Sequence, residues 1–196
     1  MEHDSKLWRK TTPENKVAAL LSRKQMGYYS LNPPVSTTLS AYSSPLLVLP
    51  SSPRRIREFV ETFGKNFCRE LHFDFVPFEA AETPESPGFV PYEVYLFHQV
   101  ASDLCEIDKP LKNRCIGACG FRWVEWTDAP PCWSFQWAWF HPYFRARGNL
   151  SKAWPSFVQK YGRFHVQYPV SGAMEKFLER HQHCQPPPVV AGDAAR

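Results

Sequence analysis

The sequence predicts a mixed α/β domain, and three observations lead to that fold class. A chain of 196 residues with 43% hydrophobic and 21% charged residues is long enough for one domain with a sizeable core. Short apolar or alternating runs typical of strands are interleaved with longer stretches that have apolar residues at helical spacing. Their order is strand, helix, several strands, helix, strand, helix, and no internal repeat is present. This order favours a mixed central sheet flanked by helices.

Residues 1–44 are expected to form an N-terminal extension that consists of a short helix and a loop. Thr12 can cap the helix, Pro13 suits its first turn and Gly27 can end it. The stretch 28–44 is rich in Ser, Thr and Pro, and we interpret it as a loop lying over the domain.

The domain itself is expected over residues 45–183. An apolar run between two prolines predicts a strand at 45–50, and apolar residues at a period of 3.6 predict a helix over 51–71 that starts at Ser52. Strand-like runs follow at 71–78, 92–100, 114–126 and 132–140. The last two are expected to form a hairpin through residues 127–131.

Residue alternation on these strands predicts which side chains share a face. Trp133, Phe135, Trp137 and Trp139 are expected on one core-facing side, and Cys115 and Cys119 also on one face. An aromatic core face, together with a net charge of only +4, counts against a nucleic-acid-binding surface.

The C-terminal part of the domain is expected to hold two helices around one strand. Apolar spacing predicts a helix from 150 to 161, which Gly162 ends, and a strand over 163–170 follows. Ser171 is expected to cap a closing helix over 171–181. The proline-rich tail 184–196 is predicted to be disordered.

A turn rich in arginine connects the strand at 132–140 to the next helix. The first amides of a helix carry partial positive charge and suit a phosphate group. Gly148 permits close approach of the backbone, and Arg145 and Arg147 can add charge-assisted hydrogen bonds. This turn therefore predicts a pyrophosphate-binding site.

These residues resemble the GNAT family of N-acetyltransferases. The family motif R/Q-x-x-G-x-G/A lies between the fourth strand and the following helix, and Arg145-Ala146-Arg147-Gly148-Asn149-Leu150 matches its arginine and first glycine. Pro142 and Gly117 also stand where many family members have these residues. The resemblance covers about Pro45 to His183.

The resemblance implies a GNAT-like mixed sheet and a function as an acetyl-CoA-dependent N-acetyltransferase. The acceptor would be an amine of a small molecule or of a protein. The pantetheine arm of acetyl-CoA would lie between the strands at 134–140 and 163–170. The residues implied to bind acetyl-CoA are Phe140, His141, Arg145, Ala146, Arg147, Gly148, Asn149, Leu150 and Ser151.

The resemblance leaves the catalytic groups open. Family members use a tyrosine on the last helix to protonate the leaving thiolate, but Phe177 stands at that position and cannot donate a proton. Ser171 and Tyr168 are the candidate substitutes, although Tyr168 could simply pack. Glu125 is our first choice for a general base and His98 the second. The competing interpretations are a solvated strand residue for Glu125 and a buried, hydrogen-bonded histidine for His98.

Two further departures favour an alternative function. Leu150 replaces the small second residue of the motif, and the last two strands of the family are missing after His183. The acceptor pocket would then need the N-terminal extension or a second subunit of a homodimer. The alternative is a non-catalytic GNAT-like protein that acts by binding a partner protein.

The sequence predicts neither a metal site nor a membrane span. The six cysteines show no zinc-site spacing, and His181, His183 and Cys184 form only a weak candidate cluster. The chain has no apolar run long enough for a span and no signal-peptide pattern at its start. We therefore expect a cytoplasmic protein with reduced cysteines.

Overall fold

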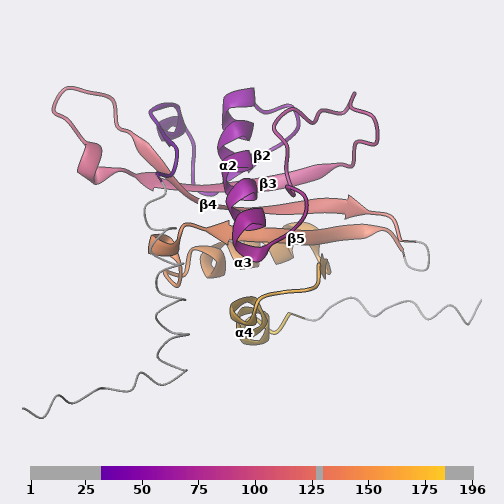
Figure 1. The fold of residues 1–196 in the computed structure, drawn as a ribbon. Helices are drawn as coiled ribbons and strands as arrows, with labels where there is room; N and C mark the ends of the chain where they lie inside the picture. Colours follow the sequence, from indigo (N-terminus) through magenta and orange to yellow (C-terminus); the bar gives the residue numbers. More distant parts are fainter. Residues whose placement is uncertain (1–31, 127–129, 184–196) are drawn as a thin grey trace, which may run out of the picture.

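The computed structural model describes residues 32–126 and 130–183, which form a six-stranded mixed sheet with helices on both faces (Figure 1). The predicted fold class, a GNAT-like α/β arrangement with a mixed central sheet flanked by helices, is confirmed. The strands are β1 (Val35–Ser36), β2 (Leu46–Val48), β3 (Tyr92–Val100), β4 (Asn113–Val124), β5 (Cys132–Phe140) and β6 (His165–Val166). The α-helices of the described residues are α2 (Arg54–Leu71), α3 (Asn149–Tyr161) and α4 (Gly172–Arg180).

The sheet has the strand order β2-β3-β4-β5-β6, and β1 pairs with β4 beyond the end of β5. All pairings are antiparallel except that of β5 with β6, which is parallel. The connection from β5 to β6 consists of α3 and its flanking turns, so this part is a crossover unit.

Each face of the sheet carries its own hydrophobic core. Helix α2 covers one face, because Ile56, Val60, Phe63 and Phe67 recur along one side of the helix and are buried. Helices α3 and α4 cover the other face, with Trp154, Phe157 and Leu178 among the buried residues. The sheet is therefore the middle layer of three.

Two β-bulges overturn predictions about which residues share a face of the sheet, and the first of these concerns Cys115 and Cys119. Register shifts leave Ile116 as the extra residue of β4 and Gln136 as the extra residue of β5. A bulge reverses the alternation beyond it. Cys115 consequently packs in the core between the sheet and α2 (the α2 core), whereas Cys119 packs in the core on the face covered by α3 and α4 (the α3 core). Burial raises the pKa of both thiols, that of Cys115 to about 12.

The same effect separates the aromatic residues of β5. Phe135 is buried in the α3 core and Trp133 packs against it, whereas Trp137 and Trp139 lie in the α2 core. The expected single aromatic face is thus wrong, because the bulge at Gln136 lies between the two pairs.

Two predicted strands are wrong or much shorter than expected. Residues 71–78 form no strand: His72 ends α2 in a left-handed conformation (φ 58°), and the Phe73 amide donates back to the Cys68 carbonyl (3.2 Å). The strand expected at 163–170 is reduced to His165–Val166. Its pairing ends where β5 bulges, and Pro169 has no N–H with which to extend it.

Most of the other predicted elements agree with the structure to within one or two residues. The exception is α2, which begins at Arg54 with Pro53 as its N-cap, while Ser52 Oγ accepts a hydrogen bond from the Leu49 amide (2.9 Å) instead of capping the helix. Ser171 caps α4 by accepting a hydrogen bond from the Met174 amide (3.3 Å), and Gly162 (φ 62°) ends α3. Part of the loop expected at 28–44 forms β1, and Leu39 from this stretch is fully buried in the α2 core.

Several predictions fall outside the described residues. They are the helix between Thr12 and Gly27, the tip of the hairpin at 127–129 and the tail 184–196. Over the residues that the structure describes, no helix is long and apolar enough to cross a membrane.

Candidate functional site

A cavity of about 790 Å³ opens where β5 and β6 separate. The two strands pair only at Ser134 and Phe135, and the Gln167 amide donates to the Phe135 carbonyl (2.9 Å). Beyond the bulge at Gln136 the strands diverge. The cavity is lined by the second half of β5, by residues of the segment 166–171, by the segment 144–151, by α4 and by the last residues of α2. Its size is within the range of small-molecule and cofactor sites.

The backbone at the end of β5 leaves one amide facing the cavity edge. The His141 amide donates to the Ile116 carbonyl of β4 (3.0 Å). Successive residues of a strand direct their N–H groups to opposite edges, so the Phe140 amide faces the edge from which β6 has diverged. The Phe140 carbonyl points the same way and accepts a hydrogen bond from Arg145 Nε (2.8 Å).

The loop before α3 has the backbone of an anion-binding turn. Ala146 (φ 56°) and Gly148 (φ 74°) are both left-handed, and no side chain caps α3 at Gly148. The first amides of α3 therefore have neither an intrahelical acceptor nor a capping side chain. All eight residues from 144 to 151 line the cavity, so this positive helix end faces it.

Arg145 is held by an acidic residue of α2. Its guanidinium makes a bidentate ion pair with Glu70 of α2, with Nη1–Oε1 and Nη2–Oε2 distances of 2.7 and 2.5 Å. Glu70 Oε2 also accepts a hydrogen bond from Trp139 Nε1 (2.7 Å). Glu70 was not predicted as a site residue, because it lies 75 positions before Arg145 in the sequence.

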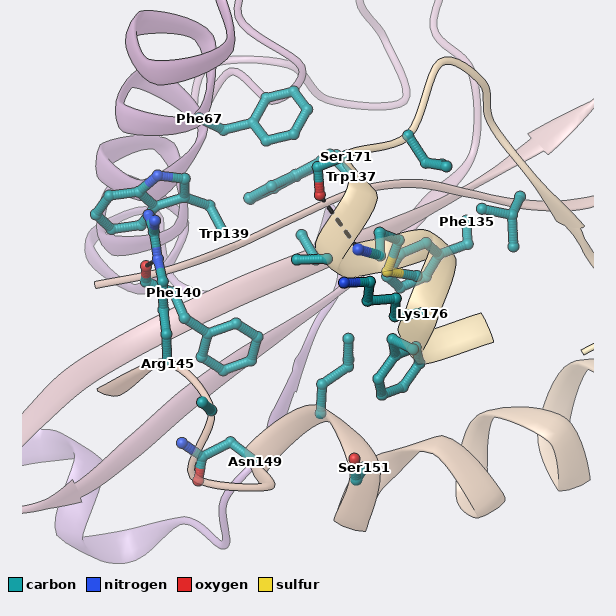
Figure 2. A pocket seen from close by; sticks show the side chains of 18 of the residues that line it. Phe67, Phe135, Trp137, Trp139, Phe140, Arg145, Asn149, Ser151, Ser171 and Lys176 are labelled. Carbon is teal, nitrogen blue, oxygen red and sulfur yellow. Dashed lines mark hydrogen bonds between the residues drawn. The ribbon is translucent and has the colours of Figure 1, made fainter. Parts of the chain in front are cut away.

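Most of the charged side chains that line the cavity are basic. Arg147, which packs over the Tyr143 ring at 4.4 Å, and Lys176 and Arg180 of α4 line it together with Arg145. Glu70 is the single acid among the described lining residues. Figure 2 shows Arg145 beside Trp139, with Lys176 on the other side of the cavity. Lys176 and Arg180 were missed by the sequence analysis, although their i, i+4 spacing on the closing helix was a usable signal.

The side of the cavity that faces α2 is aromatic. Phe67, Trp137 and Trp139 line it, and their rings are largely buried (Figure 2). Two glycines of β4 make room for the rings of β5. A Cβ on Gly120 would lie 2.5 Å from Trp137 Nε1, and a Cβ on Gly117 would lie 2.3 Å from Phe140 Cδ1.

Two serine hydroxyls and a phenyl ring complete the lining near α4. Ser171 Oγ accepts the capping bond from Met174, which leaves its own hydrogen available for donation. Ser151 Oγ lies 3.1 Å from His181 Nε2. Phe177 packs edge-on against Trp154 at 4.9 Å and lines the cavity with no hydroxyl of its own.

The structure brings together most of the predicted site residues. Those that line the cavity are Phe140, Arg145, Ala146, Arg147, Gly148, Asn149, Leu150, Ser151 and Ser171. His141, Glu125 and Tyr168 are not among the lining residues. Glu125 is exposed just past the end of β4, at the opposite end of the hairpin and roughly 25 Å along β5 from Phe140. Tyr168 is 53% exposed.

His98 is a buried and partnered histidine on β3, away from the cavity. Its Nδ1 lies 3.4 Å from Asn113 Oδ1, and its Nε2 lies 3.3 Å from the Ser43 carbonyl. This environment matches the interpretation of His98 as a buried, hydrogen-bonded histidine and not as a general base.

Two of the three residues of the candidate metal cluster, His181 and His183, lie within the described part of the chain. His183 stacks near Phe164 (4.7 Å), and burial lowers its pKa. Cys184 lies outside the described residues. Within 32–126 and 130–183, no group of three or more His, Cys, Asp or Glu side chains could hold a metal ion.

No protein-family model matches the chain, and no curated protein matches it either. The class of the protein is therefore defined by its structure: an α/β protein with an open mixed sheet, whose cavity lies at a parallel strand pair and faces a helix N-terminus.

Proposed function

We propose that this protein is an acetyl-CoA-dependent N-acetyltransferase of the GNAT type, which transfers an acetyl group to an amine of a small molecule or protein. One observation carries the proposal: the cavity lies where the parallel strands β5 and β6 separate, and the whole loop 144–151 lines it. In the resemblance described above, these are the places of the pantetheine arm and of the pyrophosphate.

The residues present fit the coenzyme. The uncapped first turn of α3, with Gly148 in a left-handed conformation, suits the pyrophosphate. Arg147, Lys176 and Arg180 add positive charge at the same cavity. Bound acetyl-CoA supplies an activated acyl group as a thioester. The Phe140 amide is the donor available to the thioester oxygen, since that of His141 is bonded to β4.

Attack by the neutral amine forms the amide bond and breaks the thioester C–S bond, so the amine nitrogen gives up one proton and the leaving thiolate takes one. We assign the delivery of the proton to the thiolate to Ser171, because its hydroxyl hydrogen is not needed for the helix cap, and the hydroxyl regains a proton from the amine nitrogen. Glu125 and Tyr168 receive no role in this proposal, since neither lines the cavity.

Isothermal titration with acetyl-CoA tests the proposal. The protein is expected to bind in the micromolar range, and the double variant Arg147→Ala/Lys176→Ala is expected to bind at least about tenfold more weakly, because two charge-assisted contacts are lost. The matched control is Arg54→Ala/Lys65→Ala, which removes two cations that pair with Glu58 and Glu61 on α2. Absence of binding by the unaltered protein would reject the proposal.

A second candidate function is a non-catalytic relative that binds a partner protein. The observation that favours it is Phe177, which fills the position of the family tyrosine and packs against Trp154 and His181. A thiol assay for CoA release, with a mixture of amines as acceptors, separates the two functions. Coenzyme binding without any release of CoA would favour this second candidate.

A further inference from the structure

The Arg145 side chain runs back from the loop before α3 to the end of β5. Its Nε donates a hydrogen bond to the Phe140 carbonyl (2.8 Å), and its Cζ lies 5.4 Å from the centroid of the Trp139 ring. Its two Nη atoms donate to the two carboxylate oxygens of Glu70. Figure 2 shows the side chain directed toward Trp139 and away from Asn149 at the start of α3. The guanidinium therefore ties the end of β5 to α2.

Glu70 fixes this position of Arg145 and is itself bonded to β5. Its Oε2 accepts hydrogen bonds from Arg145 Nη2 and from Trp139 Nε1. Because the Trp139 side chain is buried in the α2 core, its indole N–H has a fixed position. One ion pair thus holds two consecutive residues of β5: Glu70 holds Trp139, and Arg145 holds Phe140.

The peptide group between Phe140 and His141 is held at both of its polar ends. Its N–H, that of His141, donates to the Ile116 carbonyl on β4 (3.0 Å), and its carbonyl accepts from Arg145 Nε. Since a peptide group is planar, these two bonds fix its orientation. Strand β6 pairs with β5 only at Ser134 and Phe135. Arg145 therefore supplies at Phe140 the hydrogen bond that a neighbouring strand would supply in a continuous sheet.

The direction of the Phe140 amide follows from this arrangement. The N–H and the carbonyl of one strand residue point to the same edge of the strand, so a residue that is held by its carbonyl also has its N–H aimed. In the proposed function, this N–H donates to the thioester oxygen. Such a donor is effective only where it points at the oxygen on which negative charge develops, and a small displacement is costly.

We infer that Arg145 is a positioning residue of the acetyl transfer: it holds the Phe140 peptide so that the Phe140 amide points at the thioester oxygen, and Glu70 holds Arg145. This inference rests on the proposed function. It differs from the resemblance, which implies that Arg145 binds acetyl-CoA. The phosphate groups are then bound by the first amides of α3 and by the other basic side chains of the cavity.

The double variant Arg145→Gln/Glu70→Gln tests the inference, because it removes the ion pair without changing the net charge of the cavity. The rate of CoA release at saturating acetyl-CoA, with the same mixture of amines, is expected to fall by about 10- to 100-fold. The affinity for acetyl-CoA in isothermal titration is expected to stay within about twofold. An unaltered rate together with a tenfold or greater loss of affinity would overturn the inference, because a phosphate ligand behaves in that way.

Two further variants frame this result. Glu61→Gln/Lys65→Gln removes another ion pair of α2, and it is expected to change neither the rate nor the affinity. Arg147→Ala removes a cation that lines the cavity, and its main effect is expected on the affinity for acetyl-CoA, which should weaken by about three- to tenfold. An equal loss of rate in the Glu61→Gln/Lys65→Gln variant would show that the effect is not specific to Arg145.

Heteronuclear NMR of protein labelled only at phenylalanine provides a readout that needs no turnover. The Phe140 amide signal is expected to move when acetyl-CoA is added to the unaltered protein, because the amide gains an acceptor. In Arg145→Gln/Glu70→Gln at saturating acetyl-CoA, the signal is expected to move much less. An equal displacement in both proteins would overturn the inference.

Circular dichroism establishes that each variant is folded. Should the double variant not fold, Arg145→Lys provides the same test, because an ammonium keeps the charge but lacks the planar fork that reaches Phe140 and both oxygens of Glu70. It is also expected to lose rate and keep affinity, and an unaltered rate would contradict the inference. Failure of the unaltered protein to bind acetyl-CoA would instead reject the proposed function.

Discussion

Single glycines determine where the aromatic side chains of β5 lie. Gly117 and Gly120 of β4 sit directly under the rings of Phe140 and Trp137 across the strand pair. The absence of a Cβ lets these rings lie flat against the neighbouring strand, as an aromatic ring covering a strand glycine does elsewhere. The shape of the cavity wall thus depends on two positions that carry no side chain.

Gly120→Ala is expected to destabilise the protein by about 1–3 kcal/mol, because the new methyl group would overlap the buried Trp137 ring. Gly172→Ala is the control, since a Cβ there meets nothing closer than Glu175 Oε2 at 4.0 Å. Urea unfolding monitored by tryptophan fluorescence measures both. Equal stability of the two variants would refute the packing argument.

The role proposed for Ser171 can be separated from its role as a helix cap. Ser171→Ala is expected to lower kcat by about 100-fold, because the leaving thiolate loses its proton donor. Ser171→Thr keeps both cap and hydroxyl and is expected to retain most of the activity. Adding Phe177→Tyr to the alanine variant is expected to restore part of kcat, because it places a phenol in the cavity lining. A steady-state assay of CoA release measures all three, and an unaltered kcat in Ser171→Ala would remove Ser171 from the mechanism.

At the scale of secondary-structure elements, the two bulges explain where prediction from the sequence failed. The strands at β3, β4 and β5 were predicted with nearly correct bounds, because long alternating runs are a strong local signal. The faces were wrong for Cys119 and for Trp137 because one extra residue reverses the alternation. Nothing in the local sequence marks Ile116 or Gln136 as that extra residue, since a bulge is a property of the paired strands.

Deletion of Gln136 provides a direct test of the bulge in β5. Without the extra residue, the side chains of Trp137 and Trp139 would turn from the α2 core to the α3 face, so the variant is expected to have no cooperative thermal transition. Gln136→Ala keeps the bulge and loses only the hydrogen bond from Nε2 to Ser134 Oγ (2.8 Å). It is expected to cost about 0.5–1.5 kcal/mol. A cooperative transition in the deletion variant, measured by circular dichroism, would contradict this account.

Helix α4 is expected to be the acid-sensitive element. His183, next to its end, has a buried Nε2 with no hydrogen-bond partner among the described residues, and burial is the main cause that lowers its pKa from the usual 6.5. The unfolded chain binds the proton more readily than the folded protein. The free energy of unfolding is therefore highest above pH 6.5, and it decreases as the pH falls from 6.5 through the lowered pKa of the folded state.

His183→Phe is expected to reduce this loss of stability between about pH 7 and about pH 5, because the ring can stay beside Phe164 without titrating. Some dependence will remain, since burial also lowers the pKa of His165. Urea unfolding at several pH values measures the slope. An identical slope in the variant and the unaltered protein would show that His183 is not responsible.

At the scale of the whole molecule, the sequence predicted the fold class and one side of the candidate site. The loop from Arg145 to Ser151 was predictable because its residues are contiguous and the helix start has a local pattern. Glu70 and the aromatic wall were not, because α2 reaches the cavity only through packing across the sheet. Sequence reasoning thus recognised the half of the cavity that one segment builds, and missed the half that needs tertiary contacts.

The two residue pairs that join β6 to β5 have a consequence for the order in which the protein opens. Local opening requires only the free energy of the contacts that are lost. Detaching β6 and α4 breaks two pairs of one parallel ladder, whereas separating β4 from β5 breaks eight. Amide hydrogens of α4 and of Gln167 should therefore exchange with deuterium before those shared by β3, β4 and β5. The wall of the cavity formed by residues 166–180 is therefore expected to detach before the central strands, so a bound ligand would slow this exchange.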